Sequence, residues 1–539
     1  MIRLYLSCVI NKTIVRQVLI LVVIALFLWT LIFSFPALTT DEARVAFRGH
    51  LLSDSGVDEL GRRFPYLFNS LEDYQLPLVS YISTMGAIFL PKSDLGARLP
   101  FIIIGFFLVL LTYKVALQIS KEKYMGFLSS FIVATSPVLI FASKTPSEPI
   151  VLTTFFLLLF YLLNRGRLNL VLIFLTMILI IFTSKLAWFI LAPFVIYTVF
   201  IYRNTLNLKD RLNLSLISLT FVFFSFAFFL QVQQGARSLS ENNLSLFSDI
   251  TIKNGINMIR GQGMESGGSP ILGQILVNKS YFLIAGSLHW LSNIEPSVFF
   301  SKFDKDGNLG FAGMGAFSKA AIIPALLGIV FLIREKKSKI LLYPLILTLP
   351  TALIYPKFSP EIVVLTLPFV SFLIAFGLIN LKKILASIIM TLMIVELLVN
   401  FLFLSPQIKS TNDLRPYWIK SVVGDAYNLS NKDQVLISDD ITEDPASFIF
   451  WYTDLNPEAS FLNIPYPYKV RQVNLGNIKL VGASDSFRSC SANEVYKFFS
   501  SSRDLERFKD LNSARVVSTY LNSRGDVAVY FIESGVCIN

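Results

Sequence analysis

The sequence has few of the residues that build disulfide or zinc sites, with three cysteines and two histidines in 539 residues. So few cysteines exclude a disulfide framework, and neither histidine has a second ligand at zinc-binding spacing. The chain also lacks a GxxxxGK[ST] phosphate loop, a GxSxG motif and a dinucleotide fingerprint, so soluble-nucleotide chemistry has no support. Internal repeats and low-complexity tracts are absent as well.

Charge is the second scarcity. Charged residues make up 15% of the chain and hydrophobic residues 54%, with a mean hydropathy of +0.62. Soluble domains contain roughly 25% charged residues, so this balance indicates a polytopic membrane protein. The net charge of +11 does not indicate nucleic-acid binding, because most Lys and Arg fall between apolar runs, where they set topology.

Apolar runs long enough to cross a membrane recur along the chain. A span needs about 20 residues, and we predict about eleven transmembrane helices, the first of them an uncleaved N-terminal span. The segment 76–90 is short and contains Pro77 near its start, which suits an interfacial helix in the first outer loop. The predicted spans are 15–36, 97–119, 124–142, 149–163, 168–184, 186–202, 213–232, 317–333, 340–356, 360–379 and 384–404.

The positive-inside rule orients these spans. If 76–90 does not cross, the cytoplasmic segments contain only three acids, Glu122, Asp210 and Glu335. Their basic residues are Arg3, Lys12, Arg16, Lys121, Lys123, Arg165, Arg167, Arg203, Lys209, Arg211, Arg334, Lys336, Lys337, Lys339, Lys382 and Lys383. We therefore predict a multi-pass protein of the cell membrane with a cytoplasmic N-terminus and an extracytoplasmic C-terminus.

The polar C-terminal part predicts a second domain. Residues 1–404 form the transmembrane domain, and residues 405–539 are expected to form a small extracytoplasmic α/β domain. Within it, "QVLISDD", "ARVVSTYLN" and "VAVYFIES" are typical of strands, and residues 492–510 are typical of an amphipathic helix. Outside the cell, Cys490 and Cys537 can form a bridge; two free thiols are the alternative.

An acidic pair, Asp41 and Glu42, follows the first span directly in "ALTTDEARVAFRGH". Carboxylates close to hydrocarbon are costly, and such a group can accept a proton from a hydroxyl nucleophile. The alternative is helix capping, because "TTDEARVAF" has a cap residue followed by acids in a first turn. Both can hold, since a helix start also presents N–H donors to an anion.

Three further charged residues lie in predicted outer loops. Glu148 stands between two prolines in "TPSEPIVL", where helix capping is the alternative role. Lys185 in "FTSKLAWF" and Lys357 in "IYPKFSP" are basic residues on the side that disfavours them, which indicates an anionic partner; snorkelling lysines are the alternative. Two lysines beside outer acids predict binding of an anionic lipid headgroup, with phosphate as the natural ligand.

The membrane region, about residues 10–400, resembles the GT-C membrane glycosyltransferases, and within them the bacterial dolichyl-phosphate-mannose protein mannosyltransferase and aminoarabinose transferase group. That group shows an Asp-Glu pair after the first span, a Lys-Pro-Pro-Leu-like element and Arg-Leu-Pro opening the next span. The matching segments here are Asp41-Glu42, Gln75-Leu76-Pro77-Leu78 and Arg98-Leu99-Pro100. "SPVLIFASKTPSEP", "FTSKLAWFILAP" and "YPKFSPEIVVLTLPFV" are similar to later elements of the group.

The resemblance implies roles for these residues. Asp41 would be the catalytic carboxylate, with Glu42 and Glu148 as its acidic companions. Arg44, Lys185 and Lys357 would face the donor phosphate. Glu148 stands where the group often has Asp, and Gln75 stands where a phosphate-contacting Lys is common.

These roles predict transfer of a sugar from a polyprenyl-phosphate donor to a hydroxyl acceptor on protein, lipid or glycan at the outer face. The carboxylate deprotonates the acceptor, basic side chains neutralise the leaving phosphate, and a single displacement inverts the anomeric carbon. No cofactor is required, although a divalent metal is compatible with the scheme. The alternatives are a transporter or flippase of lipid-linked sugars and a membrane scaffold; mid-membrane ionisable residues, Lys114 and Glu396 apart, are too few for an ordinary transport path.

Overall fold

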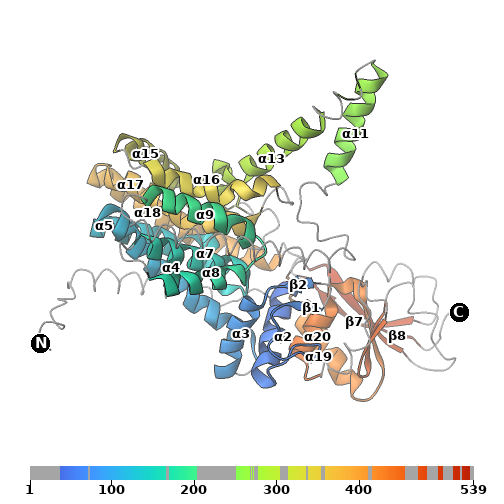
Figure 1. The fold of residues 1–539 in the computed structure, drawn as a ribbon. Coiled ribbons are helices and arrows are strands. Elements are labelled where there is room, and N and C mark those ends of the chain that lie inside the picture. The colour runs from blue at the N-terminus through green and yellow to red at the C-terminus, as the bar shows by residue number, and fades with distance from the viewer. Residues whose placement is uncertain are drawn as a thin grey trace, which may run out of the picture.

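The computed structural model describes residues 37–70, 73–90, 92–164, 169–202, 250–266, 269, 271, 277–303, 314–335, 338–353, 359–410, 415–442, 444–455, 472–481, 496–501, 514–522 and 525–534. Most of the described chain is helical. Figure 1 shows a helical bundle beside a smaller region built around a β-sheet, with α2 and α3 lying between them. The predicted spans 15–36 and 213–232, Lys357 and all three cysteines lie outside the described residues.

Every predicted span that the structure describes is helical. The bundle consists of α4 (Asp94–Ser120), α5 (Lys123–Ala134), α6 (Pro137–Lys144), α7 (Glu148–Leu163), α8 (Leu170–Ile181), α9 (Ala187–Tyr202), α15 (Ile322–Arg334), α16 (Leu342–Thr348), α17 (Pro360–Ile379) and α18 (Lys383–Ser410). Short 3-10 helices, η4 (Lys319–Ala321), η5 (Ser338–Leu341) and η6 (Leu349–Leu353), extend α15 and α16. In addition, α11 (Ile250–Glu265), α13 (Asn278–Ile294) and α14 (Pro296–Phe300) belong to the predicted long outer loop, and both figures show α11 standing clear of the bundle.

Within the described residues, α4 and α17 are long and apolar enough to cross a membrane by themselves. Helices α5 and α6 are bent by 62° at the break between them, and they provide a third crossing if the two form one span. The break falls at Thr135 and Ser136, and Ser136 Oγ donates a hydrogen bond to the carbonyl of Ala316 at 2.7 Å. The other apolar helices are shorter, so the total of about eleven spans stays a prediction.

Aromatic side chains and close helix contacts build the bundle core. The rings of Phe160, Tyr343 and Phe369 pack against one another with centroids 4.8 to 5.5 Å apart. Helices α15 and α17 touch backbone to backbone, because a Cβ at Gly328 would lie 2.0 Å from the carbonyl oxygen of Leu373. Small residues at such a crossing permit the tight helix packing that apolar surroundings favour.

Three of the basic residues expected on the cytoplasmic side lie near one end of the bundle. A small cavity lined by Ser120, Met125 and Ile340 brings the end of α4, the start of α5 and η5 together there. Their flanking residues include Lys121, Lys123 and Lys339. Helix α2 (Thr40–Asp54) contacts the opposite end of α4, through Arg98. Lys121, Lys123 and Lys339 thus lie near the end of α4 opposite to α2, and the assignment of the two ends to sides of a membrane stays a prediction.

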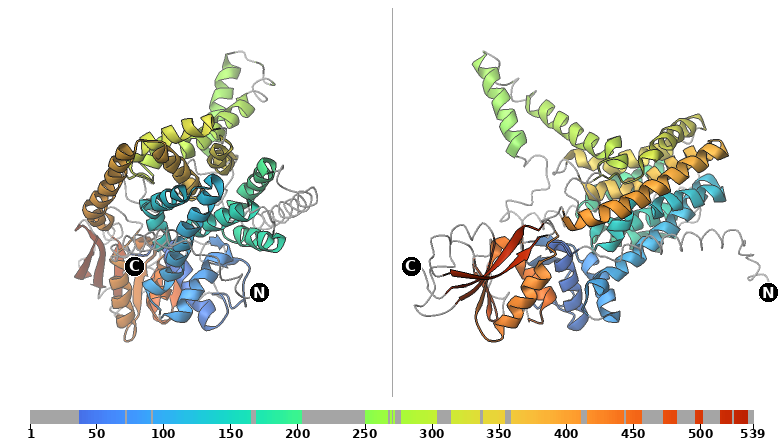
Figure 2. Two further views of the ribbon diagram at one scale, coloured as in Figure 1. Left: turned by 90° about the vertical axis from the view of Figure 1, so that its left-hand side faces the viewer. Right: turned by 180° about the vertical axis from the view of Figure 1, so that it is seen from behind.

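The C-terminal region is a mixed six-stranded sheet in the order β4-β5-β3-β6-β8-β7. Its strands are β3 (Val435–Ser438), β4 (Gln472–Leu475), β5 (Ile478–Val481), β6 (Tyr496–Ser501), β7 (Ala514–Leu521) and β8 (Val527–Ser534). Helices α19 (Ile419–Ser430) and α20 (Pro445–Tyr452) pack beside it, with the short η7 (Asp439–Ile441) after β3 (Figure 2). The strands predicted around β3, β7 and β8 are confirmed.

The predicted amphipathic helix at 492–510 is wrong where the structure describes it. Tyr496–Ser501 is strand β6, paired in parallel with β3 and antiparallel with β8. From Phe498 to Ser501 every residue is buried. A strand covered on both faces shows no alternation, and a short apolar run of this kind cannot be told from a helix by periodicity.

The sheet region and the first loop share one hydrophobic core. Ala43 and Phe47 of α2 are buried together with Ile449 of α20 and Phe531 of β8. The ring of Phe47 stacks on Phe450 with centroids 5.1 Å apart. The remaining elements of the first loop are α3 (Pro77–Phe89) and a small antiparallel hairpin, β1 (Phe68–Ser70) with β2 (Asp73–Gln75). The first and last parts of the chain therefore meet in one folded unit.

Candidate functional site

Helix α2 begins at the acidic pair that follows the predicted first span. Thr39 is its N-cap, and Thr39 Oγ1 accepts a hydrogen bond from the Glu42 backbone N–H at 3.2 Å. Asp41 and Glu42 lie in the first turn, where the helix dipole and the open N–H groups favour negative charge. The capping interpretation is thus correct for the local structure, and it leaves both carboxylates available for other contacts.

The two carboxylates have opposite surroundings. The side chain of Asp41 is 85% exposed, whereas that of Glu42 is 4% exposed. Glu42 Oε2 accepts from Arg98 Nη2 at 3.0 Å, and its Oε1 accepts from Arg415 Nη2 at 2.7 Å. A carboxylate held between two buried guanidinium groups is well placed to fix the helix and poorly placed to meet a substrate. Only Asp41 presents its carboxylate outward.

Arg44 connects the exposed carboxylate to the C-terminal region. Its Nη1 lies 3.2 Å from Asp41 Oδ1, and its Nη2 lies 3.1 Å from Asp444 Oδ2. Asp444 is the N-cap of α20, where it also accepts a hydrogen bond from the Ser447 hydroxyl. Arg44 itself is buried, so its guanidinium is held in place by both carboxylates.

Lys185 and an acid that the sequence analysis missed complete the neighbourhood of Asp41. Glu361, in the first turn of α17, interacts electrostatically with both Asp41 and Lys185. Lys185 lies in the turn between α8 and α9, and that turn is joined to the start of α3 by a hydrogen bond from Leu78 N–H to the carbonyl of Phe182 at 3.2 Å. Glu361 thus interacts with charged groups of two separate segments, the exposed start of α2 and the α8–α9 turn.

The other predicted site residues are placed less closely. Glu148 is the first residue of α7 and is half-buried. It lies four residues after Lys144, which ends α6, is fully buried and interacts electrostatically with Arg98. Lys357 lies outside the described residues. The signal for Lys144 was its position at the end of an apolar run, which also suits a snorkelling lysine.

A second buried ion pair shapes the first loop. Arg48 Nε lies 2.8 Å from Glu59 Oε1, and both side chains are fully buried. Arg48 Nη1 also donates to Gln75 Oε1 at 2.6 Å. Gln75 is therefore buried against an arginine. In the glycosyltransferase group that the sequence resembles, a phosphate-contacting Lys is common at this position. A lysine there would face Arg48, so the exchange is consistent with this local charge pattern.

Helix α20 of the C-terminal region is attached to the first loop close to this site. Lys92 Nζ donates to the carbonyl oxygens of Phe450 at 3.0 Å and Thr453 at 2.6 Å, at the C-terminal end of α20. Trp451 Nε1 donates to Asp94 Oδ1 at 3.0 Å. Burial and the charge of Asp94 raise the pKa of the Tyr452 phenol above its ordinary value. These contacts hold α20 against the start of α4.

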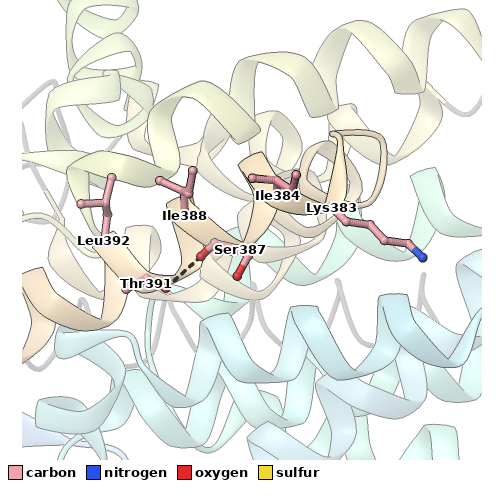
Figure 3. A pocket seen from close by; sticks show the side chains of 6 residues that line it. All are labelled: Lys383, Ile384, Ser387, Ile388, Thr391 and Leu392. Carbon is pink, nitrogen blue, oxygen red and sulfur yellow. Dashed lines mark hydrogen bonds between the residues drawn. The ribbon is translucent and has the colours of Figure 1, made fainter.

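A hollow of about 490 Å³ lies on the surface of α18. Figure 3 shows its lining side chains along one face of that helix: Lys383, Ile384, Ser387, Ile388, Thr391 and Leu392. It lies at the Lys383 end, whereas Arg415, which contacts Glu42, follows the other end of α18. The hollow is therefore remote from Asp41.

Metal ligands do not cluster at the site. Among the described residues, no group of three or more His, Cys, Asp or Glu side chains could hold a metal ion. Asp41 pairs with Arg44, at 3.2 Å. The expectation that no cofactor is required stays a prediction.

Comparison with known proteins identifies the fold. No protein-family model matches the chain, and no curated protein matches it. The crystal structure of ArnT from Cupriavidus metallidurans in the apo state superimposes with a TM-score of 0.55 at 13% identity, covering 97% of this chain and 98% of that one. ArnT from the same organism bound to undecaprenyl phosphate gives a TM-score of 0.52 at 11% identity, over 96% and 98%.

The archaeal oligosaccharyltransferase AglB from Archaeoglobus fulgidus, in complex with an inhibitory peptide and a dolichol-phosphate, gives a TM-score of 0.47 at 12% identity over 86% of this chain and 62% of that chain. The superposition with ArnT runs over nearly the whole of both chains. The protein therefore has the fold of ArnT over nearly its whole length, which confirms at the level of fold the resemblance seen in the sequence. It is a membrane protein by this fold and by its apolar helices.

Proposed function

We propose that the protein is a glycosyltransferase that moves a sugar from a polyprenyl-phosphate donor to a hydroxyl acceptor at the outer face of the cell membrane. The observation that carries the proposal is the exposed carboxylate of Asp41 at the head of α2, beside Arg44 and within electrostatic range of Glu361, which also interacts with Lys185. An outward carboxylate next to cations is the arrangement that proton abstraction beside a phosphate requires.

The chemistry follows from these charges. Lys185 and Arg44 neutralise the donor phosphate, which is a good leaving group and needs little acid help. Asp41 accepts the proton of the acceptor hydroxyl and aligns it for in-line attack on the anomeric carbon. The bond from that carbon to the phosphate oxygen breaks as the new glycosidic bond forms, so a single displacement inverts the centre.

The other predicted site residues take supporting parts in the proposal. Lys357 is a further cation for the phosphate, and Glu148 a further acid near the acceptor. Glu42 acts by fixing α2 through its two arginines, as its burial suggests. The reaction draws on no cofactor, although a divalent metal is compatible with it.

The donor class has support from a structural neighbour. ArnT has been crystallised with undecaprenyl phosphate, a lipid phosphate of the kind that such a donor would release. The acceptor belongs to protein, lipid or glycan, and nucleic acid is not a partner. In this proposal the α2 end of the bundle faces the exterior and the end with Lys121 and Lys339 faces the cytoplasm, which leaves the N-terminus inside.

Mass spectrometry of the glycolipids and glycoproteins of a host expressing the wild-type chain tests the proposal. The wild type should add a sugar to one pool, and Asp41→Asn should lower that product by about 10²- to 10⁴-fold, the usual contribution of a general base. The matched control is Asp433→Asn, which removes a half-exposed carboxylate paired with Lys497 in the C-terminal region and should leave the product unchanged.

A product that persists with Asp41→Asn would argue for a flippase, in which the outer charges only bind the lipid-linked sugar. No product in either pool with the wild type would remove the transferase function altogether. Folding of each variant is checked by size-exclusion profile and thermal unfolding in detergent.

A further inference from the structure

Arg44 is shared between two carboxylates that come from opposite ends of the chain. Its two terminal nitrogens reach Asp41 on α2 and Asp444 at the start of α20, at 3.2 and 3.1 Å. The Asp444 side chain is 16% exposed and that of Arg44 is 9% exposed. A largely buried guanidinium that pairs with two carboxylates at once is held in a defined orientation.

The sheet region is held rigidly at this point. Phe450 of α20 stacks on Phe47 of α2, and Lys92 binds the carbonyl groups at the other end of α20. Asp444 is further fixed because it caps α20, accepting from the Ser447 N–H at 3.3 Å and from its hydroxyl. The fold of the C-terminal region thus sets the position and direction of the Asp444 carboxylate. Because Arg44 pairs with that carboxylate, the orientation of its guanidinium is set as well.

We infer that Asp444 is a positioning residue of the site: by taking one side of the Arg44 guanidinium, it orients Arg44 and limits the positive charge that acts on Asp41. This inference rests on the proposed function and gives the C-terminal region a part in it. Asp41 must be ionised to accept a proton and must also be basic enough to hold it. Arg44 favours the ionised form of Asp41, and Asp444, by sharing Arg44, keeps that effect small enough for Asp41 to remain basic.

The charged groups near Asp41 can be assigned to the elements that surround it. Helix α2 supplies Arg44 and, on its buried side, Glu42, which is engaged by Arg98 and Arg415. The α20 side supplies Asp444, and α17 supplies Glu361, which also interacts with Lys185 of the α8–α9 turn. Helix α3 carries no charged residue, and Asp94 at the start of α4 is bound to Trp451. Among these groups, Asp444 is an acid that pairs with Arg44 in competition with Asp41.

Two substitutions separate the charge of Asp444 from its capping role. Asp444→Asn keeps a good N-cap and removes the charge, whereas Asp444→Glu keeps the charge and weakens the cap. Asp433→Asn serves as the matched control, since it removes a half-exposed carboxylate of the same region that pairs with Lys497. The full-length chain is used in every case.

The assay measures, across pH, the transfer of labelled sugar from polyprenyl-phosphate mannose and polyprenyl-phosphate aminoarabinose by membranes of a host that expresses the full-length chain. Asp444→Asn should lower kcat about tenfold and move the acid limb of the pH–rate profile about one pH unit lower, because Arg44 then acts on Asp41 alone. Asp444→Glu should restore most of kcat and the position of the limb. Affinity for undecaprenyl phosphate, measured separately, should change less than threefold in Asp444→Asn, roughly the scale of a remote charge.

The outcomes distinguish the two levels of the argument. If the wild type transfers sugar and Asp444→Asn matches it in kcat and pH profile, the positioning role is overturned while the transferase stands. If Asp444→Glu is worse than Asp444→Asn and the acid limb is fixed in both, Asp444 only caps α20, and the inference is equally overturned. Absence of transfer by the wild type from both donors, with Asp41→Asn indistinguishable from it in the glycan pools, removes the proposed function and the positioning role with it.

Discussion

The two faces of α2 place adjacent residues in contrasting environments. Asp41 points outward toward Arg44, while Glu42 points inward and is enclosed by Arg98 and Arg415. In the sequence the two acids are equivalent, and both are plausible bases. In the structure one is accessible to a substrate and the other joins α2 to α4 and to the C-terminal region. Residues of the same chemistry thus divide between an exposed position and a buried structural one according to which face of one helix turn they occupy.

The largest effect should come from the inner face. Glu42→Gln leaves Arg98 and Arg415 buried without their counter-charge, and breaking a buried pair in this way costs about 3–5 kcal/mol. We expect a marked loss of folded protein and a strongly lowered thermal midpoint in detergent. The matched change on the outer face, Asp41→Asn, should leave the midpoint almost unaltered. Equal stability of the two variants would contradict the division between the faces.

A smaller effect should come from the attachment of α20 to the first loop. Lys92→Met keeps the apolar stem but removes the ammonium that binds the carbonyl groups of Phe450 and Thr453. Hydrogen bonds from a charged group contribute about 1.5–3 kcal/mol. Burial lowers the pKa of Lys92, and this desolvation offsets part of that gain.

We therefore expect Lys92→Met to cost about 1 kcal/mol, the scale of an ordinary hydrogen bond. The change should appear as faster proteolysis of the C-terminal region while the helical bundle stays intact. Proteolysis at the wild-type rate would show that the shared core around Phe47 alone holds the two parts together.

The smallest effect concerns His50, near the end of α2. Burial lowers its pKa, and Asp54, 3.2 Å away, opposes that shift. Because its folded pKa is the lower one, the unfolded chain binds more protons, and stability is lost as the pH falls from about 6.5 through the folded value. Between pH 7.5 and 5.5 the thermal midpoint of the wild type should fall further than that of His50→Gln. The difference should stay within about 1 kcal/mol, the range of partly exposed pairs. A larger fall in His50→Gln would reverse the sign of this assignment.

Much of the helical fold could be predicted from the sequence because apolar runs are long and strongly marked. The predicted span at 360–379 coincides with α17, and the interfacial segment at 76–90 contains α3. The helix start at Thr39 was likewise visible, since a capping residue and two acids stand in order. Local chemistry is sufficient for such elements.

What could not be predicted depends on contacts between distant residues. Arg44 and Asp444 are 400 residues apart, and nothing near either one indicates the other. Glu361 appeared only as part of a Pro-containing helix start, and Arg415 as a lone arginine after a predicted span. The exception is α20, whose "DPASF" has Asp at the cap and Pro at the first position, a helix-start signal that was present and overlooked.

The bond between Glu42 and Arg415 also constrains the order in which the protein can mature. The two residues are separated by 373 positions. At ordinary synthesis rates the ribosome needs about 20 to 75 seconds to travel between them. Until then the early carboxylate has only Arg98 as a buried partner, and the terminal sheet has not yet been made. A nascent chain that stalls before residue 415 therefore leaves the buried Glu42 carboxylate paired with Arg98 alone.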